Sequence, residues 1–410
     1  MQGCALLGRL WKVSRAVRRA TVTDAINTGS LWPSQLLSAL QQRGYIASAG
    51  ASDRPPAFVF DIDGVLIRGS RVLEPAKKAL ARLYENGGRT PRFPICFLTN
   101  GGGVTEQQKA DELSSWLGVQ VKENQVVLSH TPFKSLVPTL GNQPVMVAGV
   151  GQVPEVAQHY GFKHVLTPAD VARALPSAAP FWKDKPEQQA AAPGVCPIKN
   201  LGYGSAKRPI EAILVFKDPA DWYLDLQIMT DVIMGGGVIR QWSPTQKPCR
   251  TVKAYFSNPD LLWAADHPAP RYGQGGFATA LQALHKEVTG RKLECQFFGK
   301  PNRAPYELAE HLLYDQAVEL RLVDSQQSWK EEPARAFGAI YAMGDNPKAD
   351  IAGAKAQGLP WVSMLVRTGV FSGDTKNDEE HPADVVVDDV LDAVEAALHR
   401  TRSMRWHSMR

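Results

Sequence analysis

Four short polar segments of this 410-residue chain each follow an apolar run of the kind that forms a buried strand. In chain order they are Asp61-Ile62-Asp63-Gly64, Thr99-Asn100, Gly299-Lys300-Pro301 and Gly344-Asp345-Asn346, the last with Asp350 one helical turn further on. Each segment alone is a weak signal, because Asp and Gly are common wherever a strand ends in a turn. Together, each at a strand end, they predict one site that contains carboxylates, a lysine, a hydroxyl and an amide.

This set of groups suits the transfer of a phosphoryl group. A carboxylate that attacks a phosphate dianion meets like charge, so a cation must lie between them, and Mg²⁺ prefers oxygen ligands. Asp61 and Asp345 are placed to hold Mg²⁺, and Asp61 is also predicted to attack phosphorus and form an aspartyl-phosphate. Asp63 is predicted to protonate the leaving alkoxide and then to deprotonate the attacking water. This chemistry needs no organic cofactor.

The other polar groups are predicted to bind and orient the phosphate. Lys300 and the Thr99 hydroxyl would neutralise the equatorial oxygens, over which the transition-state charge is spread. The Asn100 amide is a further candidate for a phosphoryl oxygen, and Asn346 and Asp350 are predicted to support the site. The reaction expected is the hydrolysis of a small phosphomonoester.

Strands and helices alternate along the chain from residue 57. Apolar runs at 57–60, 94–98 and 126–128 alternate with helical spacing at 76–84 and 106–117. The alternation predicts an α/β, Rossmann-like fold, in which helices cover both faces of a doubly wound parallel sheet. The active site of such a sheet lies beyond the carboxyl ends of its strands, where the polar segments stand.

A second alternating unit interrupts the first. Its predicted strands are 145–148, 212–216 and 252–256, and its helices are 154–160 and 221–234. Residues 176–209, rich in Pro, Ala, Gln and Lys, are interpreted as a long surface insertion. The first pattern then resumes, with predicted strands at 296–298, 339–343 and 361–366 and helices at 305–319 and 351–357. The predicted boundaries are 57–133 and 293–399 for the main unit and 134–292 for the inserted one.

The polar segments resemble the four motifs of the haloacid dehalogenase (HAD) superfamily. DIDGVL, LTN, GKP and GDNPKAD occur in the order of motifs one to four, and Ser257-Asn258-Pro259-Asp260 is similar to the T-N-P-D segment of the NagD-like class. That class carries a large α/β cap between motifs two and three. The resemblance covers roughly residues 57–400 and implies a HAD core with an inserted cap domain. The basic start of the chain extends the likeness to a mitochondrial family of this class.

The resemblance also implies a role for each motif residue. The matches are Asp61 as nucleophile and metal ligand, Asp63 as acid/base and as metal ligand through its carbonyl, Thr99 and Lys300 at phosphate-binding positions, Asp345 as metal ligand, and Asp350 as supporting acid. By analogy with capped relatives, the chain is expected to form a homodimer through its cap. The departures lie in the cap, where Phe216-Lys217-Asp218 replaces a more usual small-residue strand end. They leave the identity of the ester open.

The positive charge of the chain is concentrated at its start. Residues 1–45 hold six basic side chains and one acidic one, which accounts for the formal net charge of +5. Leu6, Leu10, Val13 and Val17 recur at helical spacing, with basic residues on the other side. Such an amphipathic, Arg-rich segment is typical of a mitochondrial transit peptide, although a basic disordered tail has the same composition. We therefore expect a mitochondrial protein, with the matrix as its compartment.

The rest of the chain limits the classes of partner. Its charge is close to neutral, which does not favour nucleic acid, and the basic run at 400–410 is interpreted as a solvated tail. The apolar runs are too short to span a bilayer, so no stable membrane insertion is expected. The five cysteines include no CxxC pair, which argues against a zinc site or a disulfide framework.

Two functions from different classes remain open. One is a Mg²⁺-dependent phosphatase, and the other is a mitochondrial binding or assembly module that keeps the fold while hydrolysis is slow or absent. A pure binding module has no need of the charged set Asp61, Asp63, Lys300, Asp345 and Asp350, which is complete here. A dehalogenase needs no acid at position 63. The residues therefore favour phosphate hydrolysis.

Overall fold

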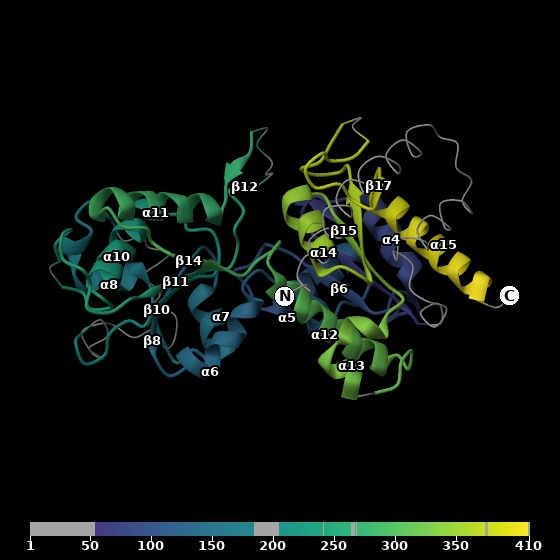
Figure 1. Ribbon diagram of the computed structural model, residues 1–410, viewed down its shortest axis with the longest axis horizontal. Coiled ribbons are helices and arrows are strands. Elements are labelled where there is room, and N and C mark those ends of the chain that lie inside the picture. The colour runs from purple at the N-terminus through teal and green to yellow at the C-terminus, as the bar shows by residue number, and fades with distance from the viewer. Residues whose placement is uncertain are drawn as a thin grey trace, which may run out of the picture. The chain divides into compact units, whose positions relative to one another are not determined.

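The computed structural model describes residues 54–183, 205–240, 242–263, 267, 269–325, 327–373 and 376–408. The predicted transit peptide, residues 1–45, lies outside these ranges, as do residues 184–204 of the predicted insertion. Residues 53–410 form one compact unit, in which two parallel sheets are each flanked by helices (Figure 1). Among the residues described, no helix has the length and apolar character needed to cross a membrane.

The first sheet has six parallel strands in the order β17-β16-β15-β1-β6-β7. They are Val385–Val387 (β17), Trp361–Val366 (β16), Ala339–Gly344 (β15), Pro56–Phe60 (β1), Ile95–Leu98 (β6) and Val126–Val127 (β7). In the buried central strand β1, Phe58 and Phe60 pack on one face of the sheet and Ala57 and Val59 on the other. Such a strand is apolar throughout because both of its faces are covered.

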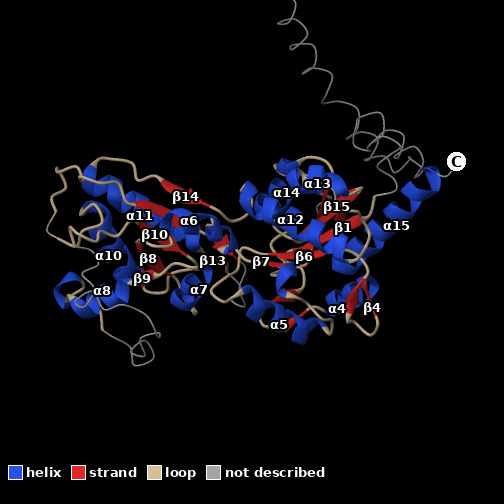
Figure 2. Cartoon of the chain, turned by 90° about the horizontal axis from the view of Figure 1, so that it is seen from below, coloured by secondary structure: helices blue, strands red, loops and turns tan. Residues whose placement is uncertain are grey.

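Helices cover both faces of the first sheet, as Figure 2 shows. Glu74–Leu83 (α4), Glu106–Leu117 (α5) and Val390–Ser408 (α15) pack on the Phe58 face, and Arg303–Glu319 (α12) and Ala352–Gln357 (α14) pack on the other. The predicted doubly wound α/β fold is confirmed. Helix α5 has the predicted bounds because Thr105 forms a capping box at its start and Gly118, at φ 70°, ends it.

The second sheet has five parallel strands in the order β14-β11-β10-β8-β9. They are Cys295–Phe297 (β14), Lys253–Phe256 (β11), Ala212–Val215 (β10), Pro144–Ala148 (β8) and His164–Leu166 (β9). Pro168–Ala174 (α8), Trp222–Met234 (α10) and Gln274–Thr289 (α11) pack on one face, and Val137–Leu140 (α6) and Val153–Tyr160 (α7) on the other. This sheet and its helices are called the cap below, and the first sheet and its helices are called the core.

Two sequence-based boundaries need correction. Strand β14 pairs with β11 at the edge of the cap sheet, so the prediction that 296–298 returns to the first sheet, with the core resuming at 293, is wrong. Three partly exposed residues carry too little pattern to specify a pairing partner. In addition, α15 continues to Ser408, so the predicted break at residue 400 lies inside a helix.

Short elements complete the described part of the chain. They are the hairpins Ile67–Arg68/Arg71–Val72 (β2/β3), Tyr84–Glu85/Thr90–Pro91 (β4/β5) and Leu262–Trp263/Arg271–Tyr272 (β12/β13), the helix Gln327–Glu331 (α13), the 3₁₀ turns Glu123–Gln125 (η2), Thr131–Leu136 (η3), Pro176–Ala178 (η4) and Pro333–Ala336 (η6), and the π-helical turn Pro347–Ile351 (η7).

A buried polar network joins the cap to the core. The Tyr160 hydroxyl, from cap helix α7, donates to Glu106 Oε1 of core helix α5 over 2.6 Å and lies 2.8 Å from His130 Nδ1. The Gly103 amide donates to His130 Nε2 over 3.0 Å, so the ring carries its proton on Nδ1. Burial lowers the pKa of His130 to about 4, which agrees with a neutral ring. This network therefore fixes the packing of the cap on the core.

Candidate active site

Two carboxylates lie at the carboxyl ends of neighbouring core strands. Phe60 of β1 pairs in register with Met343 of β15, and the Asp61 amide donates to the Met343 carbonyl over 2.9 Å. Asp61 follows β1 and Asp345 follows β15, so the two side chains start at the same level of the sheet. Both are buried, with 8% and 4% of their surface exposed. The predicted meeting of these two residues is what the structure shows.

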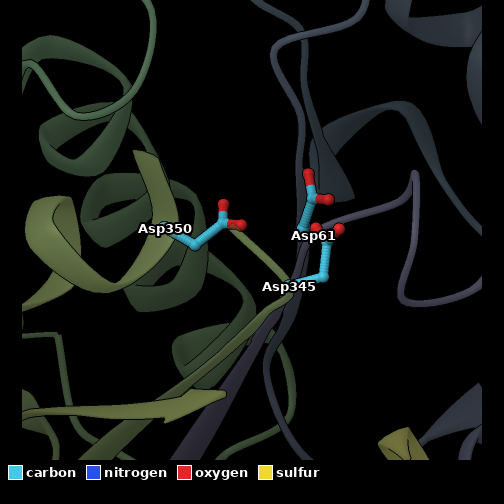
Figure 3. Close-up of side chains that lie close together, drawn as sticks. All are labelled: Asp61, Asp345 and Asp350. Atoms are coloured by element: carbon cyan, nitrogen blue, oxygen red, sulfur yellow. The ribbon is translucent and has the colours of Figure 1, made fainter. Parts of the chain in front are cut away.

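A third carboxylate, Asp350, completes the acidic cluster. The Oδ2 atom of Asp350 accepts a hydrogen bond from the backbone amide of Asn346 over 3.0 Å. The side-chain Oδ1 of Asn346 accepts one from the backbone amide of Lys348, also over 3.0 Å, and so caps η7. Carboxylate oxygens of Asp61, Asp345 and Asp350 all lie within 4.8 Å of one another, with the three side chains converging as in Figure 3. Asn346 supports the cluster by ordering the turn that carries Asp350.

Lys300 provides the positive charge inside this cluster. Its Nζ donates to Asp350 Oδ1 over 2.5 Å, to Asp61 Oδ1 over 2.6 Å and to the Leu98 carbonyl over 2.9 Å. Only 3% of the residue is exposed. The loop that carries it follows β14, so an edge strand of the cap sheet delivers this lysine to the core.

Asp345 is enclosed by two loops that have no side chains next to it. A Cβ on Gly64 would lie 2.3 Å from Asp345 Oδ2, and a Cβ on Gly369 would lie 1.9 Å from it. The Val370 amide donates to the same oxygen over 2.6 Å. The sequence analysis missed this second loop. The available signal was Thr368-Gly369, two residues after strand β16 of the same sheet.

The acidic cluster holds more negative charge than Lys300 balances. Burial raises the pKa of Asp61 well above its ordinary value, with Lys300 opposing the shift and the neighbouring carboxylates adding to it. Burial and the charge of Asp350 raise the pKa of Asp345 to about 7. Burial alone would lower the pKa of Lys300, but Asp350 and Asp61 outweigh it and hold that pKa well above its usual value. Three carboxylates thus share one ammonium group.

This donor set fits a hard divalent cation. All three candidate ligands are buried carboxylates, and Mg²⁺ prefers such oxygen donors over nitrogen or sulfur. Their excess negative charge would be compensated by a dication. The ligands expected from the sequence are Asp61, Asp345 and, through its carbonyl, Asp63, with Asp350 in a supporting role. The geometry makes Asp350 a candidate ligand as well.

Asp63 and Thr99 approach the same glycine-containing loop beside the cluster. A Cβ on Gly101 would lie 3.2 Å from Thr99 Oγ1 and 3.7 Å from Asp63 Oδ2. Thr99 Oγ1 accepts from the Gly101 amide over 2.9 Å, which leaves the hydroxyl hydrogen available for a ligand oxygen. Asp63 has access to solvent, yet desolvation by the surrounding loops raises its pKa, against the charges of Lys109, Lys300 and Lys217. A raised pKa favours the protonated form that a general acid needs.

Asn100 holds the loop that carries Lys300. Its amide nitrogen donates to Asp260 Oδ2 over 2.9 Å and to the Lys300 carbonyl over 3.0 Å, while its Oδ1 accepts from the Lys300 amide over 2.8 Å. Both N–H groups of the side chain are therefore engaged in this structure, and the side chain anchors the Lys300 loop. Asp260, in the segment similar to T-N-P-D, is the partner that the sequence analysis did not assign.

Comparison with known proteins agrees with this geometry. Residues 58–163 match the family model for haloacid dehalogenase-like hydrolases, and residues 297–393 match a second model described as HAD-hydrolase-like. A mitochondrial hydrolase of Saccharomyces cerevisiae is 35% identical over 352 residues, which cover 84% of this chain and 96% of that protein. The chain belongs to the haloacid dehalogenase-like hydrolase family. The resemblance drawn from the four motifs is thereby confirmed.

Two further proteins extend the comparison for this HAD hydrolase. A cardiolipin synthase (CMP-forming)/mitochondrial hydrolase fusion protein of Schizosaccharomyces pombe is 36% identical over 345 residues. The match covers 84% of this chain but 53% of the fusion protein, so the chain spans about half of that relative. The solved structure of a hypothetical protein from Pyrococcus horikoshii has a TM-score of 0.53 at 20% identity, and covers 83% of this chain and 99% of that one. It supports the fold.

Proposed function

We propose that this HAD hydrolase is a Mg²⁺-dependent phosphatase that cleaves a small phosphomonoester through a covalent intermediate on Asp61. One observation carries the proposal. A buried carboxylate at the carboxyl end of β1 is held by Lys300 at 2.6 Å, within 4.8 Å of two further buried carboxylates. A structural ion pair would need one acid for one lysine. Three acids around one lysine form a site that is incomplete without a cation.

The first half of the reaction uses Asp61 and Asp63. The free Oδ of Asp61 attacks phosphorus, the bond from phosphorus to the ester oxygen breaks, and Asp63 gives its proton to the departing alkoxide. Lys300 fixes the other Asp61 oxygen, so one orientation of the carboxylate is favoured. The Thr99 hydroxyl is positioned to donate to a phosphoryl oxygen.

The second half releases inorganic phosphate. Asp63, now ionised, takes a proton from a water molecule that attacks the phosphorus of the acyl phosphate, and the bond to Asp61 breaks. The solvent exposure of Asp63 gives that water a path to the site. A bound Mg²⁺ would supply charge neutralisation between the carboxylate and the phosphate, with Asp61, Asp345 and Asp350 as the side chains available to hold it.

We place this activity in mitochondria, with the matrix as the proposed compartment. The support is the amphipathic basic segment at residues 1–45 and the names of two relatives, which both include a mitochondrial hydrolase. The S. pombe relative also joins its hydrolase part to a CMP-forming synthase. A nucleoside monophosphate such as CMP therefore belongs among the esters to be tested.

The proposal is tested by phosphate release from a panel of metabolite phosphates, with Mg²⁺ and with a chelator in its place. We expect hydrolysis of one or a few esters only when the metal is present, and none with Asp61→Asn. Hydrolysis that persists in the chelator, or in the variant, would contradict the mechanism. No release from any ester would favour the binding-module alternative.

A further inference from the structure

Lys217 follows cap strand β10 by two residues, and its side chain lies against a loop of the core. A Cβ on Gly103, in the loop after β6, would lie 2.6 Å from Lys217 Cδ and 3.6 Å from Lys217 Nζ. Gly103 has φ +87°, which other residues rarely adopt. The core loop therefore leaves the space that the lysine side chain occupies.

Lys217 approaches the loop that Asp63 also approaches. Gly101 and Gly103 bracket this short segment, with Asp63 Oδ2 and Thr99 Oγ1 next to the first and Lys217 Nζ next to the second. Both groups therefore lie against the same short segment of the core. In the proposed mechanism Asp63 protonates the departing oxygen, so the leaving group would lie on this side of the site.

Lys217 is the cation here that remains available for a ligand. Lys300 is bound by Asp61 and Asp350, and Lys109, the other lysine that acts on Asp63, is paired with Glu112. Within the part of the chain that the structure describes, no acceptor lies within bonding distance of the Lys217 ammonium group, and the side chain is half-buried. The side chain of the adjacent Asp218 lies near Gly273: a Cβ on Gly273 would lie 3.7 Å from Asp218 Oδ1.

We infer that Lys217 selects phosphomonoesters whose leaving group carries a second negative charge, a carboxylate or a second phosphate. This inference rests on the proposed function and adds the chemical class of its substrate. An ammonium group partly shielded from water binds an anion more strongly than a fully exposed one does. The cap thus contributes a recognition charge beside the acid that protonates the leaving group.

The test compares esters that differ in one charged group. The first pair is 3-phosphoglycerate and glycerol 3-phosphate, and the second pair is 1,3-propanediol bisphosphate and 3-hydroxypropyl phosphate. With the full chain and Mg²⁺, we expect kcat/KM to favour the charged member of at least one pair by about tenfold or more. The pair that shows the preference identifies carboxylate or phosphate as the second anion.

Substitutions then assign the preference to one side chain. Lys217→Met should bring the ratio of kcat/KM within the preferred pair close to one, while Lys217→Arg should keep most of the preference. Lys253→Met is the matched control, because Lys253 is exposed at the opposite end of the cap sheet. Equal kcat/KM within both pairs for the wild-type chain, or a preference that survives Lys217→Met, overturns the inference. If Mg²⁺ produces no phosphate release from any ester, including the esters whose leaving group is uncharged, both the proposed function and this inference are overturned.

Discussion

Lys300 is the residue that allows three carboxylates to be buried together. A buried ion that loses its partner costs several kcal/mol, because desolvation is no longer offset by attraction. Lys300 bonds to two of the acids, and the backbone amide of Val370 bonds to the third. The arrangement stabilises the carboxylates only in part, and this leaves them able to bind a dication.

Asp61→Asn tests the nucleophile. We expect the rate of phosphate release to fall by at least about 10³-fold, since an amide oxygen is a poor nucleophile. The fold should persist, because the amide has the same shape and removes one of three like charges. Asp315→Asn, at an exposed position of α12, is the control that should keep full activity. Circular dichroism of both variants checks the fold.

The raised pKa of Asp345 predicts how metal binding depends on pH. Its folded-state pKa is about 7 against an ordinary 3.8, so the folded chain retains a proton that the unfolded chain loses between these values. Stability without metal should therefore fall as pH rises from about 4 to 7. Because Mg²⁺ competes with this proton, we expect it to raise the melting temperature more at pH 8 than at pH 5. The same Mg²⁺ effect at both pH values would contradict the assignment of this cluster as the metal site.

At the level of elements, the loop after β1 packs against Asp345 at Gly64, where there is no room for a side chain. Gly64→Ala should lower activity about 10²-fold, since its Cβ would displace a carboxylate of the site. Gly87→Ala is a matched control, because Gly87 also has positive φ but nothing within 4 Å of the added Cβ. Both changes should cost roughly 1–2 kcal/mol of folding free energy. A loss of activity in both variants would attribute the effect to backbone strain.

The junction between α5 and α7 gives a prediction about stability. Tyr160→Phe removes the hydrogen bond to the buried Glu106 and leaves His130 Nδ1 without its partner. We expect the free energy of unfolding to fall by about 2 kcal/mol, as measured by urea denaturation. Tyr272→Phe, with 70% of the residue exposed, should change it by less than about 0.5 kcal/mol. If Tyr160→Phe left the free energy of unfolding unchanged, this network would not be what holds the cap in place.

Sequence reasoning found the strands whose apolar runs are buried on both faces. β16 and α5 have their predicted bounds, and Asp61 and Asp345 meet because the parallel core strands β1 and β15 end at one edge. Lys300 reaches them from the edge strand of the cap sheet. The errors concern contacts between distant segments. The partner strand of β14 and the hydrogen bonds of Asn100 to residues 260 and 300 depend on how the cap packs, which no local pattern encodes.

At the level of the whole molecule, the start of the chain gives a separate prediction. Residues 1–45 fused to a fluorescent protein should direct it to mitochondria, because an amphipathic basic helix is the signal that import recognises. Microscopy with a mitochondrial dye measures the outcome. The control fusion replaces five of the six basic residues with serine, at Arg9, Lys12, Arg15, Arg18 and Arg19. A cytosolic passenger in the unaltered fusion would remove the support for the proposed compartment.

Lys300 lies in the loop that follows β14, the last strand of the cap. This position limits how such caps can be exchanged between relatives. An exchange at residue 293 would take β11 away and leave β14 behind without its pairing strand. The Lys300 backbone is held by Asn100 of the core, so the core side of the junction begins at Gly299. A working chimera therefore has its seam between Phe298 and Gly299. In this molecule the recombination boundary lies two residues from Lys300, and a donor cap must end its edge strand at that point.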